Sequence, residues 1–475
     1  MSRLPLIEGV SSYIKEKNIS FCMPGHKYGK GFLQTREGIT LSRDLLKYDI
    51  TEVEGVDNLH NAEGIIKESQ ELLSEYYKSK KSYFLVNGST SGNLAMIFSA
   101  FNEGDKIIVE RNCHRSIFNG IIMRKLKPVY IKNKINDKFN APLSIDMEHF
   151  FQIVKKNSDA KGIIITYPNY YGICTDLRVI VKEAKKYNMK VLVDSAHGAH
   201  FGVNKLLPKN AIELGADMVV MSSHKTLPSF TQTAYLHIGN SVDEHKVDFY
   251  VSAFLSTSPS YMLMCSMEYA RYYLEEKGDA AYTKLIDMLS HYRSMINTLS
   301  RFHIIGKEDI QNDDFDIDTT RYVINVEKGY SGHKLLEYLR TKKIQAEMSD
   351  SQNVVLIFSP FNTEKELKKL YEALKTCPMD LIEEKYIETR KYDIPIMKII
   401  PCEIMNKKKV SIKIEKAEGK ISANSIVPYP PGIPLIMPGE IISGNTIDVI
   451  KYNIRNGMTI LGLDKERGTI DIVKE

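Results

Sequence analysis

The segment Ala216-Asp-Met-Val-Val-Met-Ser-Ser-His-Lys-Thr-Leu-Pro-Ser-Phe-Thr-Gln232 decides the fold of this 475-residue chain. Its apolar run, Met218 to Met221, predicts a buried strand that ends in small polar residues and delivers Lys225 to the carboxyl edge of a sheet. A lone lysine is usually a solvated surface group. A lysine that follows a buried strand is desolvated, loses its proton more readily and becomes nucleophilic. The pattern therefore singles out Lys225 as a candidate catalytic residue.

A second apolar run, Val191-Leu-Val-Asp194, places an aspartate at the end of another predicted strand. An amine and a carboxylate at neighbouring strand ends fit the two sides of pyridoxal phosphate. The amine forms a Schiff base with the aldehyde, and the carboxylate pairs with the protonated pyridine nitrogen and keeps the ring an electron sink. The sequence therefore predicts pyridoxal phosphate as the cofactor, with Lys225 and Asp194 as its two holders.

Short β-branched runs alternate with amphipathic segments between Ser82 and Gly239. The runs are Tyr83–Val86, Lys106–Val109, Pro128–Ile131, Gly162–Thr166, Val191–Asp194, Met218–Met221 and Thr233–Ile238, and helices are expected at Gly92–Phe101, Asp146–Lys156 and Leu177–Tyr187. Continuous apolar strands separated by helices predict an α/β fold with a mainly parallel, seven-stranded sheet covered on both faces. Ligands of such sheets lie outside the carboxyl ends of the strands, where Asp194, Ser222 and Lys225 are expected.

The pattern changes after Ile238 and again after Cys377. We expect an N-terminal arm over 1–45, a large domain over 46–255, a helical linker and small α/β domain over 256–376, and a C-terminal α+β domain over 377–475. The last part contains Ile426-Val-Pro-Tyr-Pro-Pro-Gly-Ile-Pro-Leu-Ile-Met-Pro-Gly-Glu440, whose five prolines predict an extended path.

Composition argues against several classes of protein. The net charge of +5 comes from 64 basic and 59 acidic residues without a basic block, so no nucleic-acid partner is expected. No apolar run approaches the ~18 residues of a membrane span, and Met1 to Ser20 has no apolar secretory signal, so no membrane association is expected. The six cysteines show no C-x-x-C spacing, which favours reduced thiols and a cytoplasmic location.

Further polar motifs follow the predicted strands. Asn87-Gly-Ser-Thr-Ser-Gly92 opens a helix, and its free N–H groups and hydroxyls suit a phosphate, although such turns are common helix caps. His114 could stack on the cofactor ring, but a histidine at such a position is more often a cap or a surface residue, and Ala196 is small enough for the ring's other face. His197 could meet a substrate carboxylate or move protons. Ser222 and His224 flank Lys225 and could donate to the phosphate.

A metal site is the rival interpretation of the same region. It would use His197, His200, His224 and Asp194, which are residue types that bind zinc. It leaves Lys225 and the 87–92 loop without roles, so no metal is expected.

The chain resembles the bacterial ornithine/lysine/arginine decarboxylases of the aspartate-aminotransferase fold (fold type I), in their short form. The motifs are Met23-Pro-Gly-His-Lys-Tyr-Gly-Lys-Gly-Phe32, Asn87-Gly-Ser-Thr90, Asp194-Ser-Ala-His-Gly198, Ser222-Ser-His-Lys-Thr226, Ser256-Thr-Ser-Pro-Ser-Tyr261, Tyr429-Pro-Pro-Gly-Ile-Pro434 and Pro438-Gly-Glu440. One departure is Ser195, where the family often has glutamate. Its effect is open, and substrate preference or the pH profile could differ.

The resemblance implies roles for individual residues. Lys225 would carry the aldehyde, Asp194 would pair with the pyridine nitrogen, and His197 would lie beside the scissile carboxylate. His114 and Ala196 would flank the ring. The phosphate would be held by Ser89, Thr90, Ser222 and His224, and by Thr257 and Ser258 of a neighbouring subunit, which makes a homodimer or higher oligomer the active unit. Glu440 would bind the distal cation of the substrate, with Asp57 and Glu54 as alternatives.

The implied reaction is α-decarboxylation of a basic amino acid. Arginine giving agmatine is the first expectation, and lysine giving cadaverine or ornithine giving putrescine are the alternatives. Aminotransfer or aldol-type cleavage on the same fold, or a silent pyridoxal phosphate carrier or regulator, would be the competing functions. Release of CO₂ with an amine, rather than of a keto acid or aldehyde, separates them.

Overall fold

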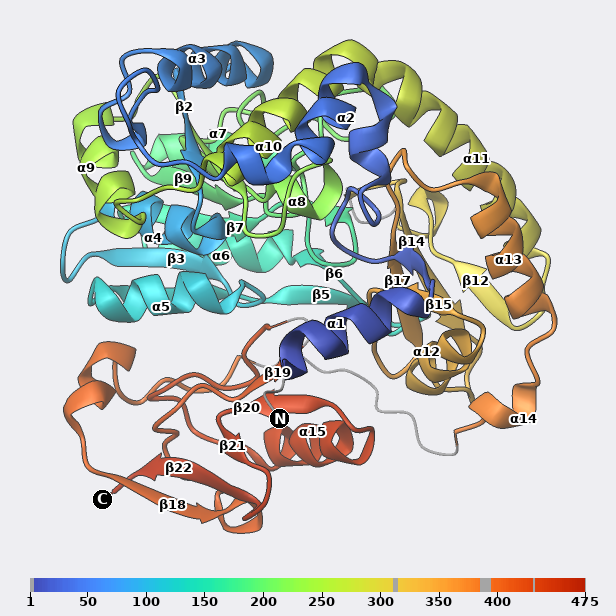
Figure 1. Cartoon of the computed structure of the whole chain (residues 1–475). Coiled ribbons are helices and arrows are strands. Elements are labelled where there is room, and N and C mark those ends of the chain that lie inside the picture. The colour runs from blue at the N-terminus through green and yellow to red at the C-terminus, as the bar shows by residue number, and fades with distance from the viewer. Residues whose placement is uncertain (1–3, 311–314, 385–393, 430–431, 475) are drawn as a thin grey trace.

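A seven-stranded sheet forms the centre of the larger domain in the computed structural model, which describes residues 4–310, 315–384, 394–429 and 432–474 (Figure 1). The strand order is β2 (Lys81–Leu85), β11 (Ala234–Ile238), β10 (Met218–Met221), β9 (Lys190–Asp194), β7 (Gly162–Thr166), β3 (Lys106–Glu110) and β4 (Lys127–Ile131). Strand β11 is antiparallel to both of its neighbours, and all other pairs are parallel. The seven apolar runs therefore form the predicted, mainly parallel sheet.

Helices flank this sheet, and several of them begin at a side chain that accepts a free N–H group. Asp146 caps α6 and Asp176 caps α7, as the predicted helices require. The helices of this domain are α3 (Ile65–Tyr77), α4 (Gly88–Ala100), α5 (Arg115–Met123), α6 (Met147–Lys156), α7 (Leu177–Lys186), α8 (Ser223–Thr226) and α9 (Glu244–Phe254), and a hairpin joins β5 (Asn133–Asn136) to β6 (Ala141–Ile145). The sequence-based prediction does not include α5, whose interior Gly120 lowers the helical propensity. A Cβ at Gly120 would lie 2.6 Å from Ile97 of α4, so glycine allows the two helices to pack closely.

The small domain contains an antiparallel sheet in the order β12 (Phe302–Ile304), β14 (Arg321–Val326), β17 (Asn353–Ile357) and β16 (Met348–Ser349). Its helices are α11 (Asp279–Asn297), α12 (Gly332–Thr341), α13 (Glu364–Lys375) and α14 (Met379–Ile382), and α10 (Tyr261–Tyr273) leads into it. Strand β13 (Asp316–Ile317) pairs with β8 (Ile173–Cys174) and so connects the two domains. This arrangement agrees with the predicted α/β character.

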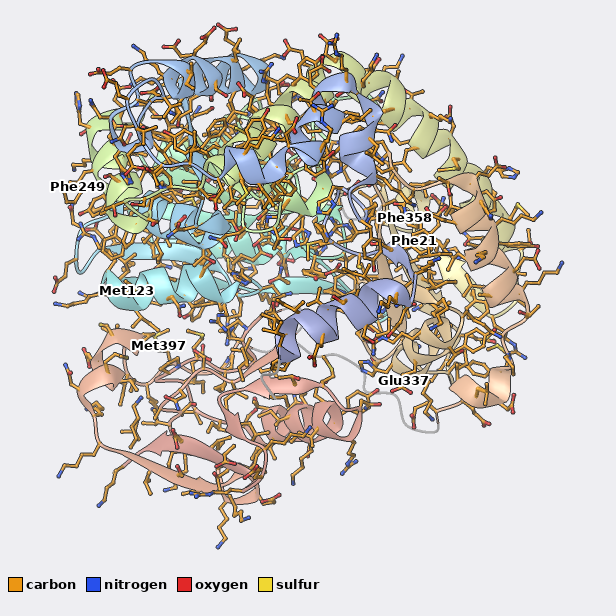
Figure 2. All side chains as sticks on the ribbon, in the orientation of Figure 1. Phe21, Met123, Phe249, Glu337, Phe358 and Met397 are labelled. Carbon is orange, nitrogen blue, oxygen red and sulfur yellow. The ribbon has the colours of Figure 1, made fainter. Side chains whose placement is uncertain are left out.

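The N-terminal segment packs against the small domain. Strand β1 (Ile19–Phe21) pairs in parallel with β15 (Ile344–Ala346). Figure 2 shows Phe21 beside Phe358, and their ring centroids are 4.9 Å apart. Helices α1 (Pro5–Lys15) and α2 (Arg36–Arg43) lie on either side of this strand in the chain.

The C-terminal α+β domain has its own isoleucine-rich core and lies below α5 in Figure 1. It contains the sheet β18 (Lys409–Lys413), β22 (Thr469–Val473) and β21 (Leu463–Asp464), the pair β19 (Val427–Tyr429) and β20 (Thr459–Leu461), and α15 (Gly444–Arg455). The proline-rich segment is extended where it forms β19, while Pro430 and Pro431 lie outside the described residues. Within the described ranges no helix combines the length and hydropathy that a membrane span requires.

Candidate active site

Lys225 lies at the carboxyl edge of the large sheet, in the short helix α8 that follows β10. The neighbouring strand β9 places Asp194 opposite Val220 of β10, so both residues emerge at the same edge. The Nζ atom of Lys225 lies 3.0 Å from Nε2 of His197. Burial lowers the pKa of Lys225 to about 8, and the charges of Asp194 and Glu347 oppose part of this shift. A pKa of about 8 leaves a much larger fraction of the amine unprotonated near neutral pH than an ordinary lysine has, as a nucleophile requires.

Asp194 is held by a hydrogen-bond network that sequence reasoning missed. Its carboxylate accepts hydrogen bonds from the side-chain amide of Asn93, at 2.9 Å, and from the N–H of Ala196, at 3.1 Å. The same amide of Asn93 also donates to Ser116 at 2.9 Å, and Ser116 Oγ is 2.9 Å from Nδ1 of His114. Asn93 follows the 87–92 loop directly, and that was the only signal in the sequence. This network joins β9, α4 and α5 around one strand end.

The ring of His197 is fixed in one tautomer. Arg321 Nη2 lies 3.4 Å from His197 Nδ1, and a guanidinium can only donate, so Nδ1 accepts and the proton is on Nε2. When Lys225 is unprotonated, the Nε2–H group donates to its amine. Burial and the nearby charges of Lys225 and Arg321 hold the pKa of His197 well below its usual range. His197 is therefore a neutral imidazole with its proton directed at Lys225.

His114 begins α5, where its Nδ1 accepts the N–H of Ser116 at 3.3 Å. It is thus a helix cap, one of the roles that the sequence left open. Burial lowers its pKa to about 4. Its Nε2 atom lies 3.5 Å from where a Cβ on Gly432 would be, so the proline-rich segment of the C-terminal domain lies against this ring. Ring stacking by His114, with the buried Ala196 on the opposite face, stays a prediction.

The predicted phosphate residues surround the start of α4 and the end of β10. Ser89 and Thr90 lie in the first turn of α4, with Ser89 partly buried and Thr90 exposed. His224 Nδ1 donates to the carbonyl of Thr233 at 2.8 Å. The neighbouring Gln232 donates to Val86 at the end of β2, at 2.7 Å. Residues 232 and 233 therefore connect the end of β2, which precedes Ser89 and Thr90, to His224.

Thr257 and Ser258 are exposed in the loop between α9 and α10. That location is compatible with contact to another subunit, and their role stays a prediction.

The two predicted substrate carboxylates are both engaged elsewhere. Glu440 is fully buried and forms an ion pair with Arg111 at 2.9 Å, and it accepts the N–H of Met437 at 2.7 Å. Asp57 accepts backbone N–H groups at the start of α3, including those of Gly64 and Ile66, at 2.9 Å each. These donors lower the pKa of Asp57 to about 2, against the opposing effect of desolvation. The geometry gives both residues structural partners, and their binding of the substrate stays a prediction.

The rival metal site does not fit the geometry. His200 pairs with Asp318 at 3.2 Å, and His224 is bound to the carbonyl of Thr233. Across the part of the chain that the structure describes, no three His, Cys, Asp or Glu side chains converge as metal ligands would. His200 instead connects the large domain to the small one.

The residues at this edge fit pyridoxal phosphate. Ser222 Oγ and Asn93 Oδ1 are buried and have no hydrogen-bond partner among the described residues. A buried polar group without a hydrogen-bond partner lowers the folding stability by about 1–3 kcal/mol, so such groups usually bind a ligand or water. A desolvated lysine and a strand-end aspartate complete a donor set suited to an aldehyde, a pyridine nitrogen and a phosphate. Fold and site together define a pyridoxal-phosphate-dependent enzyme of fold type I.

Comparison with known protein families agrees with this assignment. Residues 4–366 match the family described as "Orn/Lys/Arg decarboxylase, major domain", and residues 389–456 match "Orn/Lys/Arg decarboxylase, C-terminal domain". The chain belongs to this family. The protein is therefore a pyridoxal-phosphate-dependent carboxy-lyase that acts on a basic amino acid.

Individual relatives span almost the whole chain. The uncharacterized protein YaaO of Bacillus subtilis is 34% identical over 486 residues and covers 99% of both chains. A protein of Bacillus anthracis named arginine decarboxylase is 32% identical over 482 residues, covering 99% of this chain and 97% of its own. The crystal structure of the lysine decarboxylase of Francisella novicida has a TM-score of 0.77 at 20% identity, over 96% of this chain and 79% of that one, which shows the shared fold.

Proposed function

We propose that this protein decarboxylates L-arginine to agmatine and CO₂. The choice of arginine rests on one observation: relatives named arginine decarboxylase, such as that of Bacillus anthracis, align over nearly the full length at about one-third identity. Lysine and ornithine are the alternatives, since all three substrates present an α-amino acid and a distal cation.

Lys225 and Asp194 would hold the cofactor from two sides. Pyridoxal phosphate, when bound, supplies an electron sink for the pair of electrons that the departing carboxylate leaves on Cα. Asp194, whose carboxylate is oriented by Asn93 and Ala196, would pair with the pyridine nitrogen. Ser89, Thr90, Ser222 and His224 would bind the phosphate. His114 and Ala196 would restrict the ring to one plane.

His197 and Lys225 would manage the proton. Nε2 of His197 carries a proton that faces Nζ of Lys225, so either atom can deliver the proton that replaces CO₂ on Cα. Arg321 fixes the tautomer that makes this delivery feasible. The ring of Tyr170, which meets His197 edge-on at 4.7 Å, helps to exclude water from that side.

We also propose that the active unit is a homodimer, in which Thr257 and Ser258 reach the phosphate of the neighbouring subunit's cofactor. Their exposure in the α9–α10 loop supports this.

The cytoplasm is the compartment we propose, supported by six free cysteines. The division of the chain at residues 45, 255 and 376 likewise stays a proposal.

Headspace CO₂ measurement with arginine, lysine and ornithine in parallel, with and without added pyridoxal phosphate, tests the function. We expect the highest kcat/KM with arginine, and agmatine as the product. Lys225→Ala should lose the visible absorbance of the Schiff base and nearly all turnover. Wild-type turnover in Lys225→Ala, or a keto acid in place of CO₂, would refute the assignment.

A further inference from the structure

Glu347 is a carboxylate of the small domain whose negative charge raises the pKa of Lys225. It lies between β15 and β16 and is partly exposed. One carboxylate oxygen, Oε2, accepts the N–H of Met23 at 2.9 Å, and the other, Oε1, accepts the hydroxyl of Tyr170. Both partners are neutral donors, so the negative charge is oriented without being neutralised.

Two side chains separate Glu347 from Lys225. The ring of Tyr170 contacts the ring of His197, whose Nε2 is 3.0 Å from Nζ of Lys225. On the other side, Met23 opens the segment whose Gly25 donates to the carbonyl of His224 at 2.7 Å. A Cβ on Gly25 would lie 2.6 Å from the backbone nitrogen of Leu227, so this segment is pressed against the lysine-bearing turn. Glu347 therefore belongs to the wall of the active site.

The charge of Glu347 has no cationic partner within the described ranges, where no lysine, arginine or histidine lies within ion-pair distance of it. Lys27 is the nearby buried cation, and its Nζ donates to two backbone carbonyls, those of Cys22 at 2.5 Å and Ile357 at 2.9 Å. A carboxylate offers about four lone-pair sites, and the N–H of Met23 and the hydroxyl of Tyr170 leave room for further donors. A partly buried charge without a counter-charge is costly and is relieved when a cation binds.

We propose that Glu347 binds the distal cation of the basic substrate and sets the preference for a positively charged side chain. The proposal rests on the proposed function and assigns the cation site within it. Glu440 and Asp57, the carboxylates that the sequence suggested, are already paired with Arg111 and with the start of α3. Glu347 has no cationic partner among the described residues, and, unlike Asp194, it is not expected to pair with the cofactor.

Binding of reaction products to the holoenzyme isolates this contact from catalysis. Agmatine carries the distal guanidinium and lacks the carboxylate, and N-carbamoylputrescine is its uncharged ureido isostere. Calorimetric titration should show that Glu347→Gln weakens agmatine binding roughly 30-fold or more. This factor is at the low end of the affinity loss that follows removal of one partner of a buried charge pair. Binding of N-carbamoylputrescine should be nearly unchanged. If the wild type prefers lysine, cadaverine and pentylamine replace this pair.

Three further variants separate charge recognition from positioning. Glu347→Asp keeps the charge and should restore part of the preference for agmatine. Tyr170→Phe removes the hydroxyl that orients the carboxylate and should retain a preference for the cation. Glu327→Gln, which removes an exposed charge of the same domain that pairs with Arg301, is the matched control and should behave as wild type.

The proposal is overturned if Glu347→Gln keeps the wild-type ratio of agmatine to N-carbamoylputrescine affinity, or if it weakens both ligands equally. Absorbance of the bound cofactor in each variant shows that the site has folded. A wild type that decarboxylates no basic amino acid would instead refute the proposed function, so the two failures are distinguishable.

Discussion

The ion pair between Arg111 and Glu440 holds the C-terminal domain on the large domain. Arg111 directly follows β3, and its guanidinium donates to the carbonyls of Pro434 and Leu435, at 2.9 and 3.3 Å, as well as to Glu440. Glu440 is fully buried. We predict that Glu440→Gln weakens the docking of this domain, because the variant leaves the charge of Arg111 buried without a counter-charge.

The expected loss of stability follows from the burial of this ion pair. Removing one partner of a buried ion pair typically costs 3–5 kcal/mol, and the remaining carbonyl acceptors of Arg111 favour the lower end, about 3 kcal/mol. At about 1.4 kcal/mol for each factor of ten, the open state of this contact should become roughly 100-fold more populated. The comparison to make is the double variant Arg111→Met with Glu440→Gln, which removes both charges and should lose less stability than the two single changes together.

Hydrogen–deuterium exchange of peptides covering residues 432–442 measures this opening directly. We expect faster exchange there in Glu440→Gln and near-wild-type exchange in peptides of β9 and β10. Unchanged exchange combined with a selective rise in KM for arginine would refute the structural reasoning. That result would indicate that Glu440 binds the substrate, as the sequence suggested.

Three other outcomes follow from the site. The amine of Lys225 attacks only when unprotonated, and its pKa is about 8, so the rate at which apo-protein captures pyridoxal phosphate should rise about tenfold per pH unit below 8 and level off above; a flat rate between pH 6 and 8 would contradict this. Asp194→Ala should still form the Schiff base, seen by absorbance, but lose most turnover, and a rate within a few-fold of wild type would count against the pyridine contact. Asp57→Ala should lower the free energy of unfolding by about 1 kcal/mol through loss of helix capping, without altering the ratio of arginine to lysine turnover; a changed ratio would show that Asp57 touches the substrate.

The sheet was predictable because its evidence is local. Seven runs of β-branched residues each had to be buried on both faces, and all seven became strands of one sheet. Lys225 and Asp194 were predictable for the same reason, since each residue directly follows such a run. The positions of helices were harder to predict where the helical propensity was low, as in α5. There Gly120 allows close packing against α4.

Contacts between distant segments were not predictable. Asn93 orients Asp194 across 101 residues, and Arg321 reaches His197 across 124. Nothing near Glu440 in the chain indicates that Arg111 is its partner, and nothing near Glu347 indicates that it faces the active site. Motif resemblance therefore suggested acidic residues for the substrate cation whose carboxylates have other partners in the fold.

The amino-acid sequence by itself determined the mainly parallel sheet and the positions of Lys225 and Asp194 at its strand ends, because strand burial and the polar residues that follow each strand are encoded in adjacent residues. Only the tertiary structure decided which donors surround Glu347, which tautomer His197 adopts and how the C-terminal domain is attached. The physical reason is that a charge or a ring nitrogen is defined by the donors around it, and here these donors come from other strands, from the small domain and from the N-terminal segment.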